Sequence, residues 1–78
     1  MTSNNTPRIA LIHATPLAIA PIQDAFARHW PQPQRMSLLD DSLSVDRARD
    51  GALTPAMTQR FVDLALYARG AGCHGILF

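Results

Sequence analysis

Short apolar segments alternate with longer amphipathic ones along the chain, and this alternation predicts an α/β fold. Residues 8–13 form a short, nearly continuous apolar run, as expected for a strand covered on both faces. A second short apolar segment lies at 35–39, and a third strand is expected to begin at 75–78. Strands that alternate with helices form a parallel sheet with right-handed crossovers. The sequence therefore predicts a three-layer β-α-β-α-β unit with a parallel sheet, strand order 2-1-3, and helices on both faces.

The first helix is expected after a turn that begins at Thr15. This residue is a suitable helix cap, and the proline that follows it suits a first helical turn. Pro21 would remove a hydrogen bond from a helix interior, so we expect an irregular turn at 16–19 and a regular helix from about Ala20. The apolar face of this helix repeats at steps of three and four residues, at Ile19, Ile22, Phe26 and Trp30.

The second helix has clearer start and stop signals. Thr54 is an N-cap residue followed by Pro55 at the first helical position. Glycines at positions 70 and 72 can take the left-handed conformation that ends a helix. The buried face of this helix is expected at Met57, Phe61, Leu64, Ala65 and Ala68.

Composition and charge narrow the class of protein. The 78 residues are 47% hydrophobic and 17% charged, which is typical of a globular chain. The formal charge is +1 and the seven arginines are scattered singly, so no basic run predicts binding to nucleic acid or to a membrane surface. No apolar run approaches the roughly 20 residues that cross a bilayer, and the N-terminus lacks the regions of a signal peptide. We expect a cytoplasmic domain at 8–78 behind a disordered tail at 1–7.

The predicted strand order places a candidate site at one edge of the sheet. In an open parallel sheet, ligands bind beyond the carboxyl ends of the strands, near the point where strand order reverses. At the end of the first strand, His13 is a candidate hydrogen-bond donor or acid/base group, or a structural hydrogen-bonding residue. Thr15 and the backbone N–H groups after it are suited to an anionic oxygen at a helix N-terminus, or Thr15 only caps the helix.

Acidic and hydroxyl residues follow the second strand, where residues 40–51 are expected to form a long loop with a helical turn near 44–49. Adjacent residues that leave a strand point in different directions. One of Asp40 and Asp41 is therefore expected to cap a turn through its own side chain, rather than the pair sharing a metal or an acid/base role. Hydroxyl donors suited to a carboxylate are Ser42, Ser44 and Thr54, which are also ordinary loop residues.

The single cysteine, Cys73, raises the question of a nucleophile or general base. It precedes the third strand and so lies at the amino edge of the sheet, opposite the expected site, which favours a structural thiol. Cys73 and His74 have no metal-ligand spacing to the other histidines. No glycine-rich turn follows the first strand, so neither a phosphate-binding loop nor a dinucleotide-binding motif is predicted. One cysteine excludes an internal disulfide and is compatible with a reducing cytosol.

Four segments resemble the first half of an Asp/Glu/hydantoin racemase domain, and they lie at residues 9–15, 38–44, 51–55 and 70–78. The most specific are Leu-Asp-Asp-Ser-Leu-Ser and the strand Gly-Ile-Leu-Phe. The resemblance implies two similar α/β domains with the active site between them and no cofactor. It also implies two cysteines, on opposite faces of the substrate, that remove and return a proton next to a carboxylate, while hydrogen bonds stabilise a carbanion-like state.

The same resemblance assigns roles along this chain. The first catalytic cysteine would come directly after Phe78 and the second in the other half, so no catalytic residue is expected within the chain, and Cys73 matches neither. What it implies here is the rim of a pocket for a small carboxylate substrate, at His13, Thr15, Asp41, Ser42 and Ser44. His13 replaces the small, Asp or Asn residue of several relatives. We expect the N-terminal portion of a racemase or isomerase, inactive by itself.

The end of the chain and the number of strands add a further expectation. The chain ends on apolar residues, and three parallel strands leave an apolar edge that proteins normally cover or pair. We therefore expect a fragment of the two-domain fold, which forms a homo-oligomer through the exposed sheet edge or pairs with a missing C-terminal half. Two alternatives remain: a self-associating, non-catalytic binding module, and a decarboxylase, because relatives that decarboxylate malonates or isomerise maleate use the same scaffold.

Overall fold

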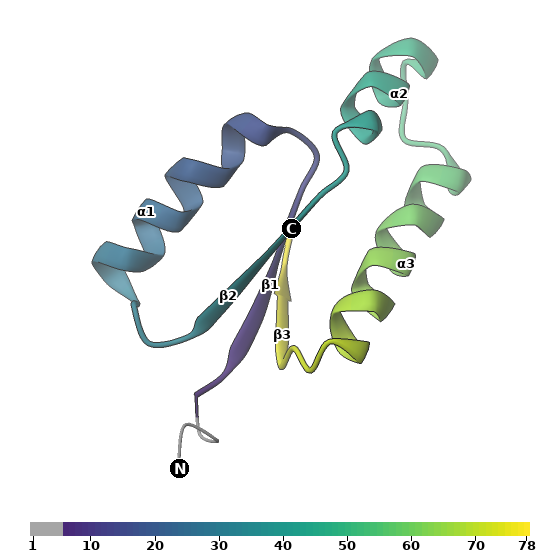
Figure 1. The fold of residues 1–78 in the computed structure, drawn as a ribbon. Coiled ribbons are helices and arrows are strands. Elements are labelled where there is room, and N and C mark those ends of the chain that lie inside the picture. Colours follow the sequence, from purple (N-terminus) through teal and green to yellow (C-terminus); the bar gives the residue numbers. More distant parts are fainter. Residues whose placement is uncertain (1–5) are drawn as a thin grey trace.

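The computed structural model describes residues 6–78 and shows an α/β fold built on a three-stranded parallel sheet (Figure 1). Its strands are β1 (Arg8–His13), β2 (Gln34–Leu39) and β3 (Gly75–Leu77). Both β2 and β3 run parallel to β1 and pair with its two sides, so the strand order is β2-β1-β3. The predicted fold class and the strand order 2-1-3 are confirmed.

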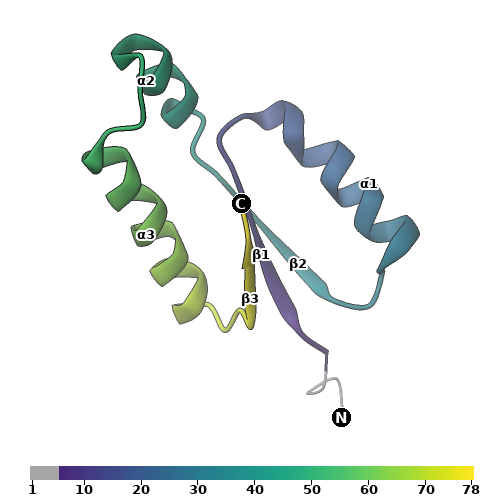
Figure 2. The same ribbon diagram turned by 180° about the vertical axis from the view of Figure 1, so that it is seen from behind.

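Helices cover both faces of this sheet. A short 3-10 helix, η2 (Pro16–Ala18), leads into α1 (Ile19–His29), while α2 (Ser42–Asp50) and α3 (Pro55–Gly70) connect β2 to β3. Figures 1 and 2 show α1 on one side of the sheet and α3 on the other, with α2 beyond the carboxyl ends of the strands. The sheet thus forms the middle layer of three.

Two threonines begin helices, as the sequence predicts. The Thr15 hydroxyl oxygen accepts a hydrogen bond from the Leu17 amide at 3.3 Å, and the Thr54 hydroxyl oxygen accepts one from the Met57 amide at 3.2 Å. The irregular turn expected at 16–19 is the 3-10 helix, and α1 begins one residue before the predicted start. Pro21 therefore lies in the first turn of α1, where its missing N–H costs little.

The segment at 40–51, predicted as a long loop with a helical turn near 44–49, is a helix over most of its length. The expected long loop is wrong, while the expected helical turn lies within this helix. The nine residues of α2 run from Ser42 to Asp50, and Gly51 ends the helix with a φ of 73°, in the left-handed region. Only one residue of α2, Leu43, is buried. A helix with so narrow an apolar face has little amphipathic pattern to mark it in the sequence.

Side-chain alternation assigns each strand residue to one helix layer. The Gln23 side-chain amide donates a hydrogen bond to the Ser37 hydroxyl oxygen at 3.1 Å, so Ser37 faces α1. The parallel register pairs Leu11 with Ser37, and neighbours in register point to the same face. His13, two residues beyond Leu11, therefore also lies on the α1 face. The opposite face packs on α3, where the rings of Phe61 and Phe78 meet edge to face at 5.5 Å.

The hydrophobic core is small and centred on β1. Its buried apolar residues are Ala10, Leu11, Ile12, Leu43, Met57 and Ala68. Two of the five residues predicted for the buried face of α3 are in this set, and the other three are half-buried. Large apolar side chains stay exposed on β3 and on α3. No helix within residues 6–78 combines the length and the apolar character needed to cross a membrane.

The start of the described chain belongs to the sheet. Pro7 accepts a hydrogen bond from the Gln34 backbone amide at 2.8 Å through its carbonyl oxygen. The first contact with the sheet is thus at Pro7, one residue before the predicted domain start at residue 8. Of the tail predicted at 1–7, residues 1–5 lie outside the described residues.

Candidate functional site

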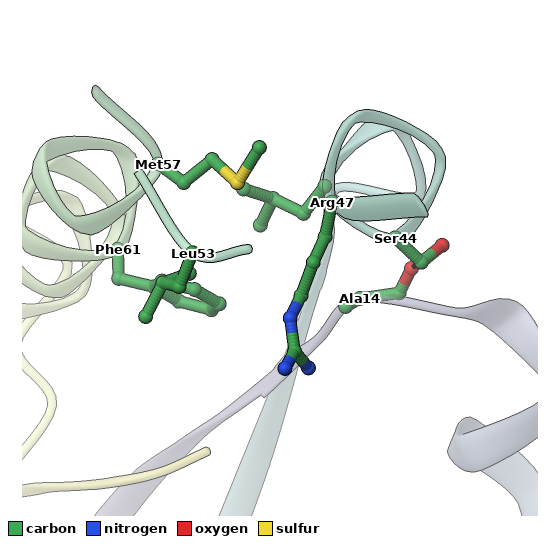
Figure 3. A pocket seen from close by; sticks show the side chains of 7 residues that line it. Ala14, Ser44, Arg47, Leu53, Met57 and Phe61 are labelled. Carbon is green, nitrogen blue, oxygen red and sulfur yellow. Dashed lines mark hydrogen bonds between the residues drawn. The ribbon is translucent and has the colours of Figure 1, made fainter. Parts of the chain in front are cut away.

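A cavity of about 380 Å³ opens at the carboxyl end of β1, between α2 and α3 (Figure 3). We call it the Arg47 cavity. Its walls are largely apolar, and its polar side chains come from α2. The lining residues are Ala14, Leu43, Ser44, Arg47, Leu53, Met57 and Phe61. This is the edge of the sheet at which open parallel α/β folds bind ligands.

Arg47 supplies the charge of this cavity. Its side chain leaves α2 and extends past Ala14 into the space between the two helices (Figure 3). The neighbouring Arg49 pairs with Asp50 at 2.9 Å and with Asp46 at 3.5 Å. The Arg47 side chain, by contrast, forms no hydrogen bond or ion pair with any residue of 6–78. A guanidinium left free beside apolar walls is suited to a carboxylate, because its planar donors match the two oxygens.

Ser44 lies one helical turn before Arg47 and on the same side of α2. Its hydroxyl is within hydrogen-bonding distance of two carbonyl oxygens, that of Ala14 at 3.0 Å and that of Asp41 at 3.2 Å. The hydroxyl proton is therefore used by the backbone, while the oxygen can still accept. Ser44 ties α2 to the loop after β1, and it can donate to a ligand only after its hydroxyl rotates.

Arg60 of α3 joins the end of β2 to α2 by ion pairs. Its guanidinium donates to the Asp40 carboxylate at 2.9 Å and to the Asp46 carboxylate at 2.7 Å, and it also contacts the Ser42 hydroxyl. Hydrogen bonds from the Ser42 hydroxyl and then from Arg60 hold the pKa of Asp40 below its ordinary value of 3.8. This network sets the position of α2, and hence of Arg47, against α3.

The turn after β2 is capped as the sequence predicts. One oxygen of Asp40 accepts hydrogen bonds from both the amide and the hydroxyl of Ser42, the amide at 3.1 Å. Asp41 stands at the N-cap position of α2 but makes no side-chain cap hydrogen bond, and it is exposed. The prediction that one of the two aspartates caps a turn through its side chain is confirmed, and that residue is Asp40.

The five predicted substrate contacts occupy different surroundings. Ser44 lines the Arg47 cavity, whereas His13 lines a second cavity on the α1 face of the sheet. Thr15 caps η2, Ser42 belongs to the ion-pair network, and Asp41 contributes its carbonyl oxygen to Ser44. The structure thus brings only Ser44 together with Arg47. The roles of all five as substrate contacts stay predictions.

Arg47 itself was not among the residues that the sequence pattern singled out. Because residues three apart share one face of a helix, the helix at 42–50 places Arg47 on the same face as Ser44. The spacing of Ser44 and Arg47 was the available signal. The helical turn expected near 44–49 contains both residues, but most of the cavity walls that Arg47 faces come from outside this segment.

Across residues 6–78, no three side chains of His, Cys, Asp or Glu come together as a metal site. Cys73 is half-buried in the turn before β3, at the amino edge of the sheet, and its amide donates to the Ala68 carbonyl at 3.1 Å. The candidate site therefore consists of an arginine, a hydroxyl and apolar walls.

Comparison with known proteins adds no further assignment. No family model, no curated protein and no solved structure matches this chain. A function for this chain therefore has to be inferred from the chemistry of the Arg47 cavity and from its place at the carboxyl edge of the sheet.

Proposed function

We propose that this chain forms the carboxylate-binding part of a cofactor-independent racemase or isomerase that acts at the carbon next to a carboxylate. One observation carries the proposal: the Arg47 guanidinium extends into an apolar-walled cavity and pairs with no carboxylate of residues 6–78. A charge-assisted, two-pronged hydrogen bond to a substrate carboxylate would satisfy it. The resemblance of four segments to the Asp/Glu/hydantoin racemase family supports the reaction class.

In this proposal the chain binds and orients the acid, and proton transfer belongs to other groups. Racemisation by two thiols requires a cysteine on each side of the substrate, and the sequence has one cysteine, which lies at the opposite edge of the sheet. Phe78 packs against Phe61, a wall residue of the Arg47 cavity. Groups supplied at the carboxyl end of β3 would therefore lie near a carboxylate held by Arg47.

The carboxylate-binding step is tested by titrating the chain with L-aspartate and with propionate while recording proton–nitrogen correlation spectra. Signals of Arg47 and Ser44 are expected to move in a saturable way. Arg47→Gln should weaken binding about tenfold or more, the range for a hydrogen bond to a charged group. Arg28→Gln is the matched control, because Arg28 is exposed on α1 and pairs with Asp24 at 3.3 Å. Equal affinity in Arg47→Gln and the native chain would refute the site.

The reaction class is tested by incubating the chain with amino acids or malonates in heavy water. The chain by itself is expected to show neither deuterium incorporation at the α-carbon nor release of carbon dioxide. Incorporation by the 78-residue chain would contradict the assignment of proton transfer to other groups. Carbon dioxide release from a malonate, without racemisation, would favour the decarboxylase that uses the same carboxylate site.

A second candidate function is self-association, and we propose a second copy of this chain as the partner. In the described chain β3 pairs on one side only, with β1. Its free side is flanked by apolar side chains on both faces of the sheet: Ile76 is 39% exposed, Leu77 45%, and Leu66 of α3 49%. Two β3 edges paired about a two-fold axis would bury all three in an interface that closes on itself.

This second candidate is tested by sedimentation velocity over a wide range of protein concentration. A monomer–dimer equilibrium is expected, and Leu77→Arg should shift it to monomer. Val45→Arg, which changes an exposed residue of α2, should leave it unchanged. A sedimentation coefficient that stays monomeric at every concentration would count against self-association and leave the carboxylate site untouched.

A further inference from the structure

The walls of the Arg47 cavity carry information about the rest of the acid that Arg47 would bind. Among the residues of the described chain that line it, Arg47 has the one charged side chain and Ser44 the one hydroxyl (Figure 3). The other walls are apolar side chains from α2, from the loop between α2 and α3, and from α3 itself. The larger of them are Leu43, Leu53, Met57 and Phe61.

Part of this apolar wall is open to water. Leu53 is 55% exposed and Phe61 is half-buried, although both line the cavity. A ligand that covers such a wall with apolar atoms removes it from water, which favours binding. The cavity volume of about 380 Å³ lies at the lower end of the range of about 300–1,000 Å³ for small-molecule sites, so the ligand has to be small.

No second cation of the described chain lines this cavity to balance a second negative charge. Arg60 of α3 already pairs with two carboxylates of the chain, at 2.9 Å and 2.7 Å. The Ser44 hydroxyl proton is used by backbone carbonyl oxygens. A second carboxylate placed against the apolar wall would therefore lose its hydration and gain no partner. A dicarboxylate avoids this cost only by turning its second carboxylate out to water, and the wall then stays uncovered.

We propose that the acid bound at Arg47 is a small monocarboxylate with an apolar body, and that the cavity discriminates against dicarboxylates. The inference rests on the proposed carboxylate site and names the substrate class of that site. The carboxylate pairs with the Arg47 guanidinium, and the apolar body covers Leu53 and Phe61. Arg47 thus selects the charged end of the acid, and the apolar wall selects the remainder.

Two acids of the same size and shape test this inference on the native 78-residue chain. In 4-methylpentanoate an isopropyl group takes the place of the second carboxylate of succinate. Isothermal titration calorimetry at neutral pH is expected to show about tenfold or tighter binding of 4-methylpentanoate, because burial of methyl groups adds affinity and burial of an unpaired charge removes it. L-Leucine and L-aspartate differ in the same way and should show the same order of affinity.

The variant Leu53→Arg places a second cation at an exposed part of the wall. It should raise the affinity for succinate relative to 4-methylpentanoate and so narrow or reverse the preference. Leu17→Arg is the control with the same change of net charge, because Leu17 is 84% exposed, belongs to η2 and does not line the cavity. This control should keep the preference of the native chain.

The outcomes separate this inference from the carboxylate site on which it rests. If the native chain binds succinate as tightly as 4-methylpentanoate, and Arg47→Gln weakens both, the substrate class is overturned and the carboxylate site stands. A preference that Leu53→Arg leaves unchanged would also overturn the role of the wall. Absence of binding by both acids, or equal affinities in Arg47→Gln and the native chain, would overturn both proposals. Should Leu53→Arg fail to fold, the two acids compared on the native chain decide.

Discussion

Replacing Leu43 by alanine tests how α2 is held over the carboxyl end of the sheet. Leu43 is 3% exposed, is the single buried residue of α2, and lines the Arg47 cavity. Leucine-to-alanine changes in cores cost about 2–5 kcal/mol. We expect about 2–3 kcal/mol here, the lower part of that range, because one side of Leu43 already borders open space. A chain of this length has a total stability of roughly 4–12 kcal/mol, so the loss is a large fraction.

The assay is urea unfolding followed by far-ultraviolet circular dichroism. With a slope of about 1 kcal/mol per molar urea for a small protein, the midpoint should fall by roughly 2–3 M. Val45→Ala is the matched control on the same helix, because Val45 is 65% exposed and should change stability by less than about 0.5 kcal/mol. Leu43→Ala should also weaken carboxylate binding, since α2 carries both Ser44 and Arg47.

Two outcomes would refute this reasoning. An unfolding midpoint equal to that of Val45→Ala would show that Leu43 does not hold α2 in place. A lowered midpoint with unchanged carboxylate affinity would show that the position of Arg47 does not depend on the packing of Leu43.

Two further predictions concern the ends of the helices. The pKa of Asp40 is lowered in the folded chain by the Ser42 hydroxyl and Arg60, so its contribution to stability is present above the unfolded value of 3.8 and is lost as pH falls through the folded value. Asp40→Asn should therefore flatten the acid limb of a plot of Tm against pH. The control Asp24→Asn, which changes an exposed carboxylate of α1, should keep the slope of that limb. Parallel acid limbs for Asp40→Asn and the native chain would contradict the prediction. Thr54→Ala should lower the free energy of unfolding by about 1 kcal/mol in urea, because the Met57 amide loses its cap, and Thr54→Ser should restore most of it. Equal losses in the alanine and serine variants would mean that the hydroxyl does not act as a cap.

Much of this architecture follows from local chemistry that can be read along the chain. Thr15 and Thr54 begin helices because each cap bond spans only two or three residues and depends on residue type. The strands follow from short apolar runs, and their order follows from the handedness of the crossovers. The same rules placed the candidate site at the carboxyl edge of the sheet and drew attention to His13 and Ser44.

Other features exist only because distant segments meet. The α2 helix has one buried residue, and Arg60 positions it by ion pairs. Arg60 lies 14 residues from Asp46 and 20 from Asp40 in the chain. The sequence of α2 by itself therefore gives little sign of where the helix packs. Arg47 faces a cavity because α2 packs between β1 and α3, an arrangement that no local pattern encodes.

The separation of His13 from Arg47 shows most clearly which features follow from local sequence and which from tertiary packing. The sequence alone predicted that His13 ends a strand and that a candidate binding edge follows it. Strand register and the packing of α1 and α3 decided that His13 lies on the α1 face and Arg47 on the other side. Residue type and short-range spacing determine the helix caps, the strands and the edge of the sheet that is the candidate site. The environment of each side chain depends instead on which surfaces of the helices and strands pack against each other.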